Sequence, residues 1–460
     1  MSGKYHEYPE YKNTENEYIG STPKLWGFGS LKRVVDQNRQ ITYGIVQAGQ
    51  NVPDGVPYIR PADMRDEGGV KNLTGLLRTS LSIASSYERS ELKSGDLVCS
   101  IGPSFGKVMV TPDVLSGANL TQGTARVAIS KKFHTRYYFW VLRSSLAYQQ
   151  WESSVGGATF RALNLGPLAD TYIPIPPHKN QVSIAGFLDH ETAKIDTLID
   201  KQQQLIQLLK EKRQTVISHA VTKGLDPNVP MKDSGVEWLG AVPEHWSLKK
   251  FGHISNVVRG GSPRPAGDPT LFNGDYSPWV TVAEITKDND MFLEETETFL
   301  TKKGSDQCRV FQKGTLVLSN SGATLGVPKI LNIDANANDG VVGFESLDSS
   351  VNIELAYLYL TTLTENLRES IKQGSGQPNL NTDIVKNIVF PGPPPCEQDQ
   401  IVTEIKDAVA RYKSLTNKAH GLTSLLKERR TALISAAVTG KIDVRHWQPS
   451  EPQARMEATA

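Results

Sequence analysis

The second half of the sequence restates the first half at an offset of about 217 residues. Residues 209–226 and 426–443 are identical at ten of eighteen positions. A second match joins residues 17–26 to residues 237–246, each ending in a tryptophan that is soon followed by Ser-Leu-Lys. Self-similarity at a fixed period is the signature of a repeated structural unit. The chain is therefore expected to fold as two copies of one unit.

Each copy contains a globular stretch, a proline-rich stop and a long helix. The globular stretches, roughly 27–177 and 247–395, combine many glycines and prolines with short β-prone runs and helical segments, so we expect an α+β fold in both. The proline-rich stops predict an extended connector before each helix, because proline fixes φ and removes a backbone donor. The expected divisions are a first domain with its N-terminal linker (1–178), a first helix (179–230), a second domain (231–395), a second helix (396–443) and a tail (444–460).

Both helical segments carry a heptad pattern typical of coiled coils. The expected seam positions are Ile184, Leu188, Glu191, Ile195, Leu198, Gln202, Leu205, Leu209, Lys212 and Val216, and then Ile401, Ile405, Ala408, Tyr412, Leu415, Ala419, Leu422, Leu426, Arg429 and Leu433. A helix over 184–216 is roughly 48 Å long, which is more than one domain needs to close its core. We expect the helices to pair as an antiparallel coiled coil with a pseudo-two-fold relation that places the domains at opposite ends. The alternative is that each helix buries its stripe against its own domain.

Charge and cysteine content narrow the functional class. The 50 lysines and arginines against 49 acidic residues leave a net charge of +1, which excludes the basic coat of an unspecific nucleic-acid binder. Residues 231–396 are acidic, with 20 Asp and Glu against 14 Lys and Arg, whereas residues 1–180 hold 15 against 20. Cys99, Cys308 and Cys396 have neither zinc-site nor disulfide-framework spacing. Without an apolar run near the ~20 residues that span a bilayer, the protein is expected to be soluble and cytoplasmic.

A duplicated domain on a rigid spacer suits a polymer with two recognition points a fixed distance apart. Half-sites one turn apart on B-DNA are ~34–36 Å from each other, which such a spacer could address. Because the two domains differ widely between the matching anchors, the half-sites need not be alike. We therefore expect a bipartite, asymmetric DNA target. The competing hypotheses are an enzyme acting alone, a coiled-coil scaffold for two protein ligands, and a DNA-binding protein without further partners.

Several motifs resemble one family closely. They are the segment 233–246, the Arg-Gly-Gly-Ser-Pro turn at 259–263, the Gly-Ser-Gly-Gln-Pro-Asn-Leu loop at 374–380, the prolines 393–395 with Glu-Gln at 397–398, and the Leu-Lys-Glu-(Lys/Arg)-Arg sequence in both helices. These residues resemble the specificity subunits of type I restriction-modification systems over nearly the whole chain. The first copy departs in two places, with Asn-Gln at 180–181 and a looser loop at 156–164.

The resemblance implies two target-recognition domains, each followed by a helical spacer. It also implies a non-catalytic subunit that reads DNA, docks two adenine-N6 methyltransferase subunits and, with two motor-nuclease restriction subunits, forms the restriction enzyme. No cofactor is expected in this chain, since S-adenosylmethionine, ATP and Mg²⁺ would belong to the partner subunits. The sequence agrees, because it has no phosphate-binding Gly-x-x-x-x-Gly-Lys-(Ser/Thr) loop, no (Asn/Asp)-Pro-Pro-(Tyr/Phe) methyltransferase motif and no metal-ligand spacing.

Candidate contact residues follow from local charge. Residues 114–151 contain five cations and interleaved aromatics but no acid, which favours a phosphate-tracking surface; a solvated face beside a core helix is the alternative. In the second domain Arg259 occupies a Gly-Gly-Pro turn, where arginine can pair with guanine, and it corresponds by offset to Tyr43. The loops at 100–107 and 319–326 could reach phosphates or be plain turns. The candidate DNA-binding residues are Tyr43, Arg60, Lys131, Lys132, Arg136, Arg259, Arg264, Lys302 and Lys303.

A second set of candidates concerns partner docking. Three cations in each helix, at 210–213 and 427–430, are expected in the last helical turns, where they would either favour the helix dipole or contact a partner. Tryptophans beside Gly-x-x-Pro turns recur with them in both copies, and two identical partners need two equivalent sites. The candidate docking residues are Trp26, Trp238, Trp246, Arg213 and Arg430.

Overall fold

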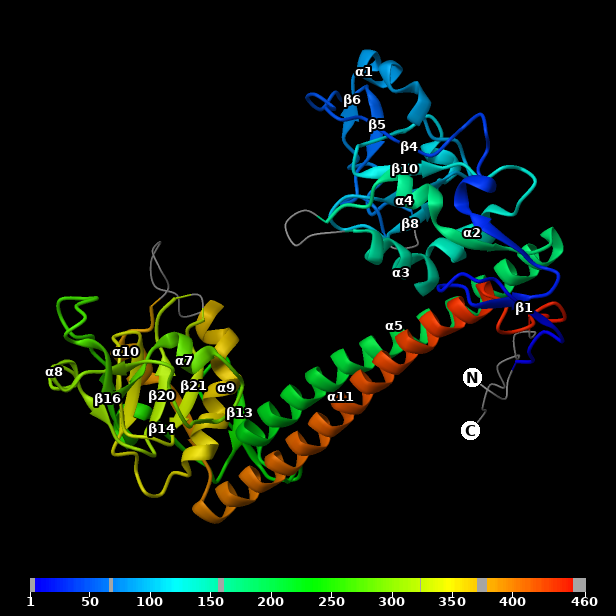
Figure 1. Cartoon of the computed structure of the whole chain (residues 1–460). Coiled ribbons are helices and arrows are strands. Elements are labelled where there is room, and N and C mark those ends of the chain that lie inside the picture. Colours follow the sequence, from blue (N-terminus) through cyan, green and yellow to red (C-terminus); the bar gives the residue numbers. More distant parts are fainter. Residues whose placement is uncertain (1–4, 66–68, 156–160, 323, 370–378, 450–460) are drawn as a thin grey trace. The chain divides into compact units, whose positions relative to one another are not determined.

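The computed structural model describes residues 5–65, 69–155, 161–322, 324–369 and 379–449 (Figure 1). The chain divides into two compact units, one made of residues 1–203 and 421–460 and the other of residues 204–420. Helices α5 (His178–Lys223) and α11 (Pro395–Val438) each contribute one part to either unit. The chain thus contains two tandem domains of mixed helix and sheet. Parts of the loops at 156–164 and 374–380 lie outside the described residues.

The first domain is built on mainly antiparallel strands. Its strands are β1 (Tyr11–Asn13), β2 (Ser21–Pro23), β3 (Gly27–Ser30), β4 (Thr42–Tyr43), β5 (Val56–Ile59), β6 (Arg78–Thr79), β7 (Leu97–Ser100), β8 (Val108–Val110), β9 (Asn119–Leu120), β10 (Thr124–Val127) and β11 (Tyr172–Ile175). Its helices are α1 (Leu81–Ser86), α2 (Thr135–Leu142), α3 (Ser145–Ser154) and α4 (Leu165–Asp170), with short 3-10 turns η1 (Leu31–Arg33), η2 (Glu88–Ser90) and η3 (Asp113–Leu115). The strand orders are β4-β10-β7-β8, β6-β5-β9, β11-β3 and β1-β2.

The second domain repeats this plan with longer strands. Its strands are β12 (Met231–Asp233), β13 (Ala241–Pro243), β14 (Ser247–Lys250), β15 (Asn256–Arg259), β16 (Phe272–Val280), β17 (Phe292–Leu293), β18 (Phe299–Leu300), β19 (Val310–Phe311), β20 (Leu316–Ser319), β21 (Pro328–Leu331), β22 (Ala335–Ala337), β23 (Val341–Glu345) and β24 (Val389–Gly392). Its helices are α6 (Phe251–Ile254), α7 (Val282–Thr286), α8 (Lys302–Ser305), α9 (Ile353–Glu369) and α10 (Thr382–Asn387). The strand orders are β15-β23-β20-β21-β17, β18-β16-β22-β19, β14-β24 and β12-β13.

The two domains share one topology. The core sheets correspond strand by strand, with β4, β10, β7 and β8 equivalent to β15, β23, β20 and β21. In both domains, the hairpin strand that carries the repeated Pro-x-x-Trp turn, β2 or β13, is followed by a strand that pairs with the last strand before the long helix. The equivalence explains the internal repeat, because the matching anchors are the turns and connectors that this shared topology needs.

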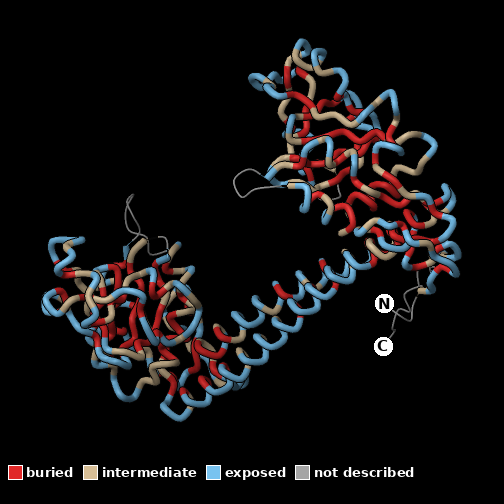
Figure 2. The backbone as a smooth tube through the Cα atoms, viewed as in Figure 1, coloured by how far each residue is buried: buried red, intermediate tan, exposed pale blue. Residues whose placement is uncertain are grey.

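The core of each unit includes parts of both long helices. In the first unit the aromatic side of α2, residues 137–140, packs with residues of α5 such as Phe187 and Leu188 and with residues of α11 such as Leu433 and Val438. In the second unit α9 packs with Ile217 of α5 and with 401–405 of α11. Buried residues accordingly concentrate in the domains and at the helix ends, whereas the middle of each helix is mostly exposed (Figure 2).

Both long helices stop at glycines, earlier than the sequence pattern indicated. Gly224 and Gly440 adopt positive φ angles of 78° and 75°. Glycine adopts this left-handed conformation at no steric cost and commonly ends helices. The helices therefore end at Lys223 and Val438 rather than at residues 230 and 443. As a correction, the cation groups at 210–213 and 427–430 do not lie in the last turns.

In the middle of the helices, the seam differs from the expected one by one residue at alternate positions, whereas Ile184 and Glu191 near the start of α5 are buried as expected. Ile199 and Ile206 are each 8% exposed, whereas Leu198 and Leu205 are 46% and 42% exposed. The second helix shows the same one-residue shift, with Thr423 buried and Leu422 exposed. From Leu188, a heptad can continue by three and then four residues or by four and then three. Apolar residue type favours the first pattern, which includes Leu198 and Leu205. The packing in the structure follows the second pattern, which includes Ile199 and Ile206. The leucines that were expected in the seam instead form an exposed row on each helix, Leu198 and Leu205 on α5 and Leu415 and Leu422 on α11.

Candidate nucleic-acid interface

Equivalent loops gather at one edge of each core sheet. Tyr43 pairs with Ala125 and Arg259 pairs with Val342, so these residues stand at matching ladder positions. Each is followed by a glycine in close contact with a neighbouring backbone. A Cβ atom on Gly44 would lie 2.0 Å from the Leu120 carbonyl oxygen, and one on Gly260 would lie 2.4 Å from the Ala337 carbonyl oxygen. Only glycine can bring its backbone this close to a carbonyl oxygen. The close contact therefore fixes the backbone position of the preceding residue, Tyr43 in one domain and Arg259 in the other.

Arg259 is exposed and held by one hydrogen bond at this edge. Its Nε donates to the Asp339 carbonyl oxygen at 2.5 Å, and Ser262 Oγ donates to the Asp339 carboxylate at 2.8 Å. The hydrogen bond from Ser262 lowers the pKa of Asp339 against the opposing effect of burial, and the charges of Arg259 and Arg264 lower it further. The arrangement orients an arginine whose remaining donors can reach a phosphate or a base edge.

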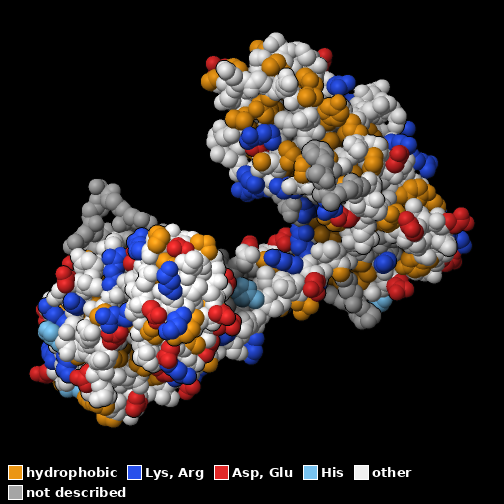
Figure 3. Space-filling view, turned by 60° about the vertical axis from the view of Figure 1, so that its left-hand side comes forward, with side chains coloured by type: hydrophobic (Ala, Val, Ile, Leu, Met, Phe, Trp, Pro, Cys, Tyr) orange, Lys and Arg blue, Asp and Glu red, His pale blue; other side chains and the backbone are white. Residues whose placement is uncertain are grey.

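The other second-domain candidates lie next to this loop. The backbone N–H of Arg264 donates to Gln307 Oε1 at 2.9 Å, which joins the loop to the segment just after α8. Lys302 and Lys303 are exposed on α8, and the hydrogen bond to Asp306 raises the pKa of Lys302. The structure therefore brings Arg264 and the α8 lysines into one neighbourhood. On the face in Figure 3, however, lysines and arginines of this domain are interspersed with acidic side chains.

The cations of the first domain divide into structural and exposed groups. Arg136 Nε donates to Asp189 at 2.8 Å, and its guanidinium lies 4.2 Å from the Phe139 ring centroid, so it ties α2 to α5. Arg60 is paired with Asp63 at 2.7 Å and remains 40% exposed. Lys131 and Lys132 are exposed in the turn before α2, and neither forms an ion pair with another residue in the part of the chain that the structure describes.

The expected phosphate-tracking stretch is therefore interrupted, which corrects the sequence-based hypothesis at Arg126. This side chain is buried on β10, where its guanidinium donates to the carbonyl oxygens of Arg89, Glu91 and Gln40. Burial lowers the pKa of Arg126. The sequence predicts a surface position from the charge, whereas β10 lies between β4 and β7; carbonyl oxygens accept from the two terminal guanidinium nitrogens, and the buried Nε has no partner within the described ranges.

The two serine loops are braced turns. Ser100 Oγ accepts from Lys107 N and donates to the Ser104 carbonyl oxygen, at 2.9 and 3.0 Å. Ser319 Oγ accepts from Val327 N and donates to the Thr324 carbonyl oxygen, both at 2.9 Å. Because these contacts are internal, they favour the plain-turn interpretation of the loops. Next to Ser319, the side-chain amide of Asn320 is fully buried, and neither its Nδ2 nor its Oδ1 has a hydrogen-bond partner among the described residues.

The docking hypothesis needs correction at three residues. Trp26 and Trp246 are each 1% exposed, so neither faces a partner. Trp246 Nε1 donates to Glu397 Oε1 at 3.0 Å, whereas Trp26 packs edge-to-face on Tyr8 with its Nε1 unpaired. The turn after each proline folds the indole back onto the end of a long helix, which buries it.

Arg430 is the third correction. Its Nε donates to Asp196 Oδ1 at 2.8 Å, so it joins α11 to α5 within the first unit. The side chain is only 15% exposed. Trp238 and Arg213 are exposed and remain available to a partner.

Sequence reasoning named two glutamines only as parts of the family-like motif and missed their structural role. Gln181 and Gln398 each occupy the fourth position of a long helix and are almost fully buried. Their spacing of 217 residues and their place after a proline run were visible in the sequence. Their hydrogen-bond partners, which are backbone groups of the proline connector and of the segment just before a core helix, were not.

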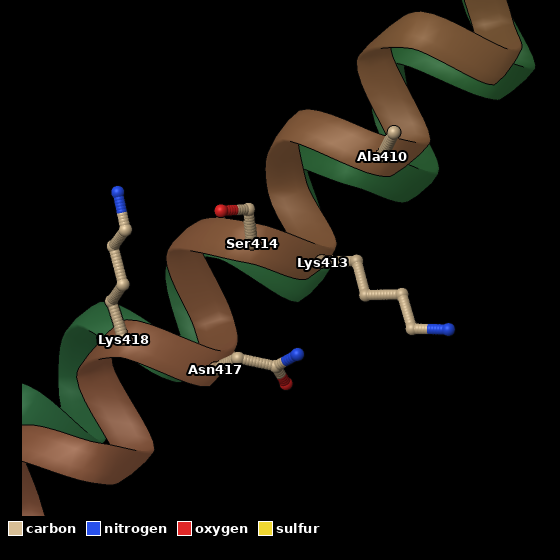
Figure 4. A pocket seen from close by; sticks show the side chains of 5 residues that line it. All are labelled: Ala410, Lys413, Ser414, Asn417 and Lys418. Atoms are coloured by element: carbon tan, nitrogen blue, oxygen red, sulfur yellow. The ribbon is translucent and has the colours of Figure 1, made fainter.

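The described structure shows no built small-molecule site. One surface hollow is lined by Ala410, Lys413, Ser414, Asn417 and Lys418, all on α11, and their side chains spread outward from the helix (Figure 4). Among the described residues, no three His, Cys, Asp or Glu side chains are grouped to hold a metal. Within the same ranges, every helix is too short or too polar to cross a membrane.

Comparison with known proteins gives concordant matches. The type I restriction enzyme MjaIX specificity subunit of Methanocaldococcus jannaschii is 32% identical over 168 residues, covering 36% of this chain and 38% of that protein. The EcoBI specificity subunit of Escherichia coli is 24% identical over 200 residues, covering 43% of this chain and 41% of that protein, so the chain spans about two fifths of the length of each. The StySPI specificity subunit of Salmonella potsdam is 21% identical over 450 residues, covering 94% and 92%.

Solved structures show the same fold. A chain from a study of complex assembly and conformational transition of the type I R-M system has a TM-score of 0.69 at 16% identity, covering 91% of this chain and 98% of that chain. The HsdS subunit from Thermoanaerobacter tengcongensis has a TM-score of 0.54 at 16% identity, covering 92% and 98%. Residues 24–208 and 243–420 match the family model of the type I restriction modification DNA specificity domain. This match covers well over half of the sequence, and the chain therefore belongs to that family.

Proposed function

We propose that this chain is the DNA specificity subunit of a type I restriction-modification complex and that each domain reads one half of a bipartite, asymmetric site. The observation that carries the proposal is the pair of matching sheet edges. They share backbone geometry down to the close-packed Gly44 and Gly260, yet they present Tyr43 in one domain and Arg259 in the other. Two domains with the same backbone geometry but different side chains at the same position are suited to recognise two different DNA sequences.

The long helices act in this proposal as the spacer between the readers. Within the first unit, Asp196 of α5 contacts Arg430 of α11, and the α5 residue Phe187, nine residues earlier, contacts Trp447, which lies beyond the end of α11. Within the second unit, Gly224 at the end of α5 adjoins Glu397 at the start of α11. Residues near the start of α5 thus contact residues near the end of α11, and the end of α5 adjoins the start of α11. This order supports an antiparallel coiled coil that sets the gap between half-sites.

The helices also provide the proposed docking surfaces for two adenine methyltransferase subunits. Leu198 and Leu205 on α5 are exposed, and their equivalents Leu415 and Leu422 on α11 are exposed to the same extent. Exposed apolar rows are costly in water unless a partner covers them. Their repetition supplies two equivalent sites, one for each of two identical partners. Two restriction subunits would complete the assembly in the cytoplasm.

Chemistry is assigned to the partners in this proposal. The chain is non-catalytic, and S-adenosylmethionine, ATP and Mg²⁺ are bound by the methyltransferase and restriction subunits. The second domain is acidic overall, so it cannot hold DNA by charge alone. Tight binding therefore requires the methyltransferase subunits to close around the duplex and add phosphate contacts, while this chain supplies the reading.

The test is co-expression with the cognate methyltransferase in a host that lacks other adenine methylation. Sequencing that detects N6-methyladenine is expected to find one split motif, and neither subunit alone should produce it. Methylation scattered without a motif would falsify the proposal. If the complex of this chain with the methyltransferase does not retain duplex DNA at low salt, a coiled-coil scaffold would be favoured instead. Cleavage of plasmid by the purified chain with Mg²⁺ would favour an enzyme acting alone.

A further inference from the structure

A buried glutamine joins each domain to its long helix. Gln181 in the first turn of α5 donates from Nε2 to the Pro176 carbonyl oxygen at 2.8 Å. Its Oε1 accepts from the backbone N–H of His134, the residue before α2, at 2.8 Å. One side chain thus connects the proline connector, the start of the long helix and the start of a core helix.

The second copy repeats the arrangement. Gln398 Nε2 donates to the Pro393 and Ser350 carbonyl oxygens, both at 2.9 Å. Its Oε1 accepts from the backbone N–H of Asn352 at 2.7 Å, and Asn352 in turn caps α9 through its own side chain. The sequence around the two glutamines differs, but the glutamine and its backbone partners are conserved between the copies.

An amide is the chemical group that this joint requires. It presents a donor to carbonyl oxygens on one side and an acceptor to an N–H group on the other, which a carboxylate or a hydrocarbon cannot do. Hydrogen bonds are directional, so the pair of bonds restrains rotation of α2 or α9 about the long helix. Further contacts reinforce each joint, with Trp140 Nε1 donating to Asp189 at 2.8 Å in one copy and Lys406 paired with Glu354 at 2.5 Å in the other.

Small rotations at such a joint matter for DNA reading. A domain of this size extends over on the order of 30 Å, so a rotation of about 7° at the joint moves its far edge by ~3.5 Å. This displacement equals one base-pair step of ~3.4 Å. We propose that Gln181 and Gln398 are positioning residues that fix each domain on its helix and thereby hold the gap of the bipartite site to a single length. The inference rests on the proposed function as a DNA specificity subunit.

The test replaces each glutamine with methionine, which keeps chain length and volume but removes both polar atoms. Gln181→Met and Gln398→Met are made separately, so that one joint stays intact in each, and Gln398→Glu is a second variant in case a methionine variant accumulates poorly. Gln400→Met is the matched control, because Gln400 is exposed on the same helix two residues away. Each full-length chain is co-expressed with the cognate methyltransferase, and methylated motifs are mapped.

The variants are expected to methylate the same two half-sites at gaps one base pair longer and shorter as well. Discrimination against these gaps should fall about tenfold, while the control keeps the wild-type gap. Lower methylation confined to the original gap would mean that the glutamines only stabilise the fold, and it would overturn the inference. A wild-type chain that produces no split motif would instead refute the proposed function itself.

Discussion

Replacing Trp26 and Trp246 by phenylalanine, one at a time, should cost the two units different amounts of stability. Both indoles are 1% exposed and follow the same proline turn in the repeat. Trp246 Nε1 donates to Glu397 at 3.0 Å, whereas Trp26 Nε1 is buried and unpaired. The same substitution therefore breaks a hydrogen bond in one unit and removes an unsatisfied donor in the other.

The magnitude follows from the comparison. The loss of packing is similar at both sites and largely cancels. A hydrogen bond to a charged group contributes about 1.5–3 kcal/mol, and Trp246→Phe loses this stabilisation. An unsatisfied buried donor costs about 1–3 kcal/mol, and Trp26→Phe removes this cost. The two substitutions therefore change stability in opposite directions, and the gap between their effects is the sum of the two magnitudes. The Glu397 side chain is 23% exposed, which lets water compensate part of its loss. We expect Trp246→Phe to destabilise its unit by about 3 kcal/mol more than Trp26→Phe destabilises its own.

The assay must resolve the two units. Hydrogen–deuterium exchange at increasing urea reports the free energy of unfolding separately for peptides from 27–155 and from 247–369. Trp238→Phe is the control, since Trp238 is 41% exposed and its replacement removes only a hydrogen bond to Tyr359, so it should cost less than the replacement of Trp246. Equal losses at Trp26 and Trp246, or a larger loss at Trp26, would refute the reasoning from hydrogen-bond satisfaction.

Three further predictions concern spacing, reading and pH. Deleting 195–201 together with 412–418 removes about 10 Å of helix and should shorten the gap of the methylated motif by about three base pairs; an unchanged gap would contradict the spacer role. Arg259→Ala should relax one half-site only and cost about 1–3 kcal/mol in binding the cognate duplex, measured by titration; an unaltered motif would exclude a base contact. Burial and the charge of His178 lower the pKa of His134, so the unfolded chain binds the proton more readily. The first unit should have its full stability above the ordinary histidine pKa of about 6.5 and lose stability as pH falls below it, and His134→Gln should abolish this loss in pH-dependent urea denaturation.

The repeat and the proline stops predicted the architecture well because both are visible in the sequence without knowledge of which residues contact one another. Two mixed domains, each followed by a long helix, can be inferred from glycine, proline and heptad spacing alone. The ends of the helices were missed because Gly224 and Gly440 each lie beside a lysine and close to an apolar residue, as residues inside a helix also do, and only the backbone conformation identifies the glycines as stops. The predicted seam was correct at the start of α5 but wrong in its middle, because the surface against which the helix packs decides whether Leu198 or Ile199 is buried.

The candidate site was harder to predict because residue type does not determine exposure. Tyr43 and Arg259 could be matched by offset, and the strand register places them at equivalent positions. Arg126, Arg136 and Arg430 were selected for their charge, but the fold engages them with carbonyl oxygens or carboxylates. Long-range partners of this kind are invisible to a single sequence. Which residues contact DNA stays a prediction.

The division of the chain also sets an order for folding during synthesis. The second unit is one continuous stretch, residues 204–420, so all of its parts have been made once that stretch leaves the ribosome. The core of the first unit includes Leu433, Ile434 and Val438 near the end of the chain. The domain that is translated first must therefore wait for the last segment to close its core. A nascent chain arrested before residue 421 would hold a finished second unit and an open first one, with buried aromatic residues of α2 still lacking part of their cover.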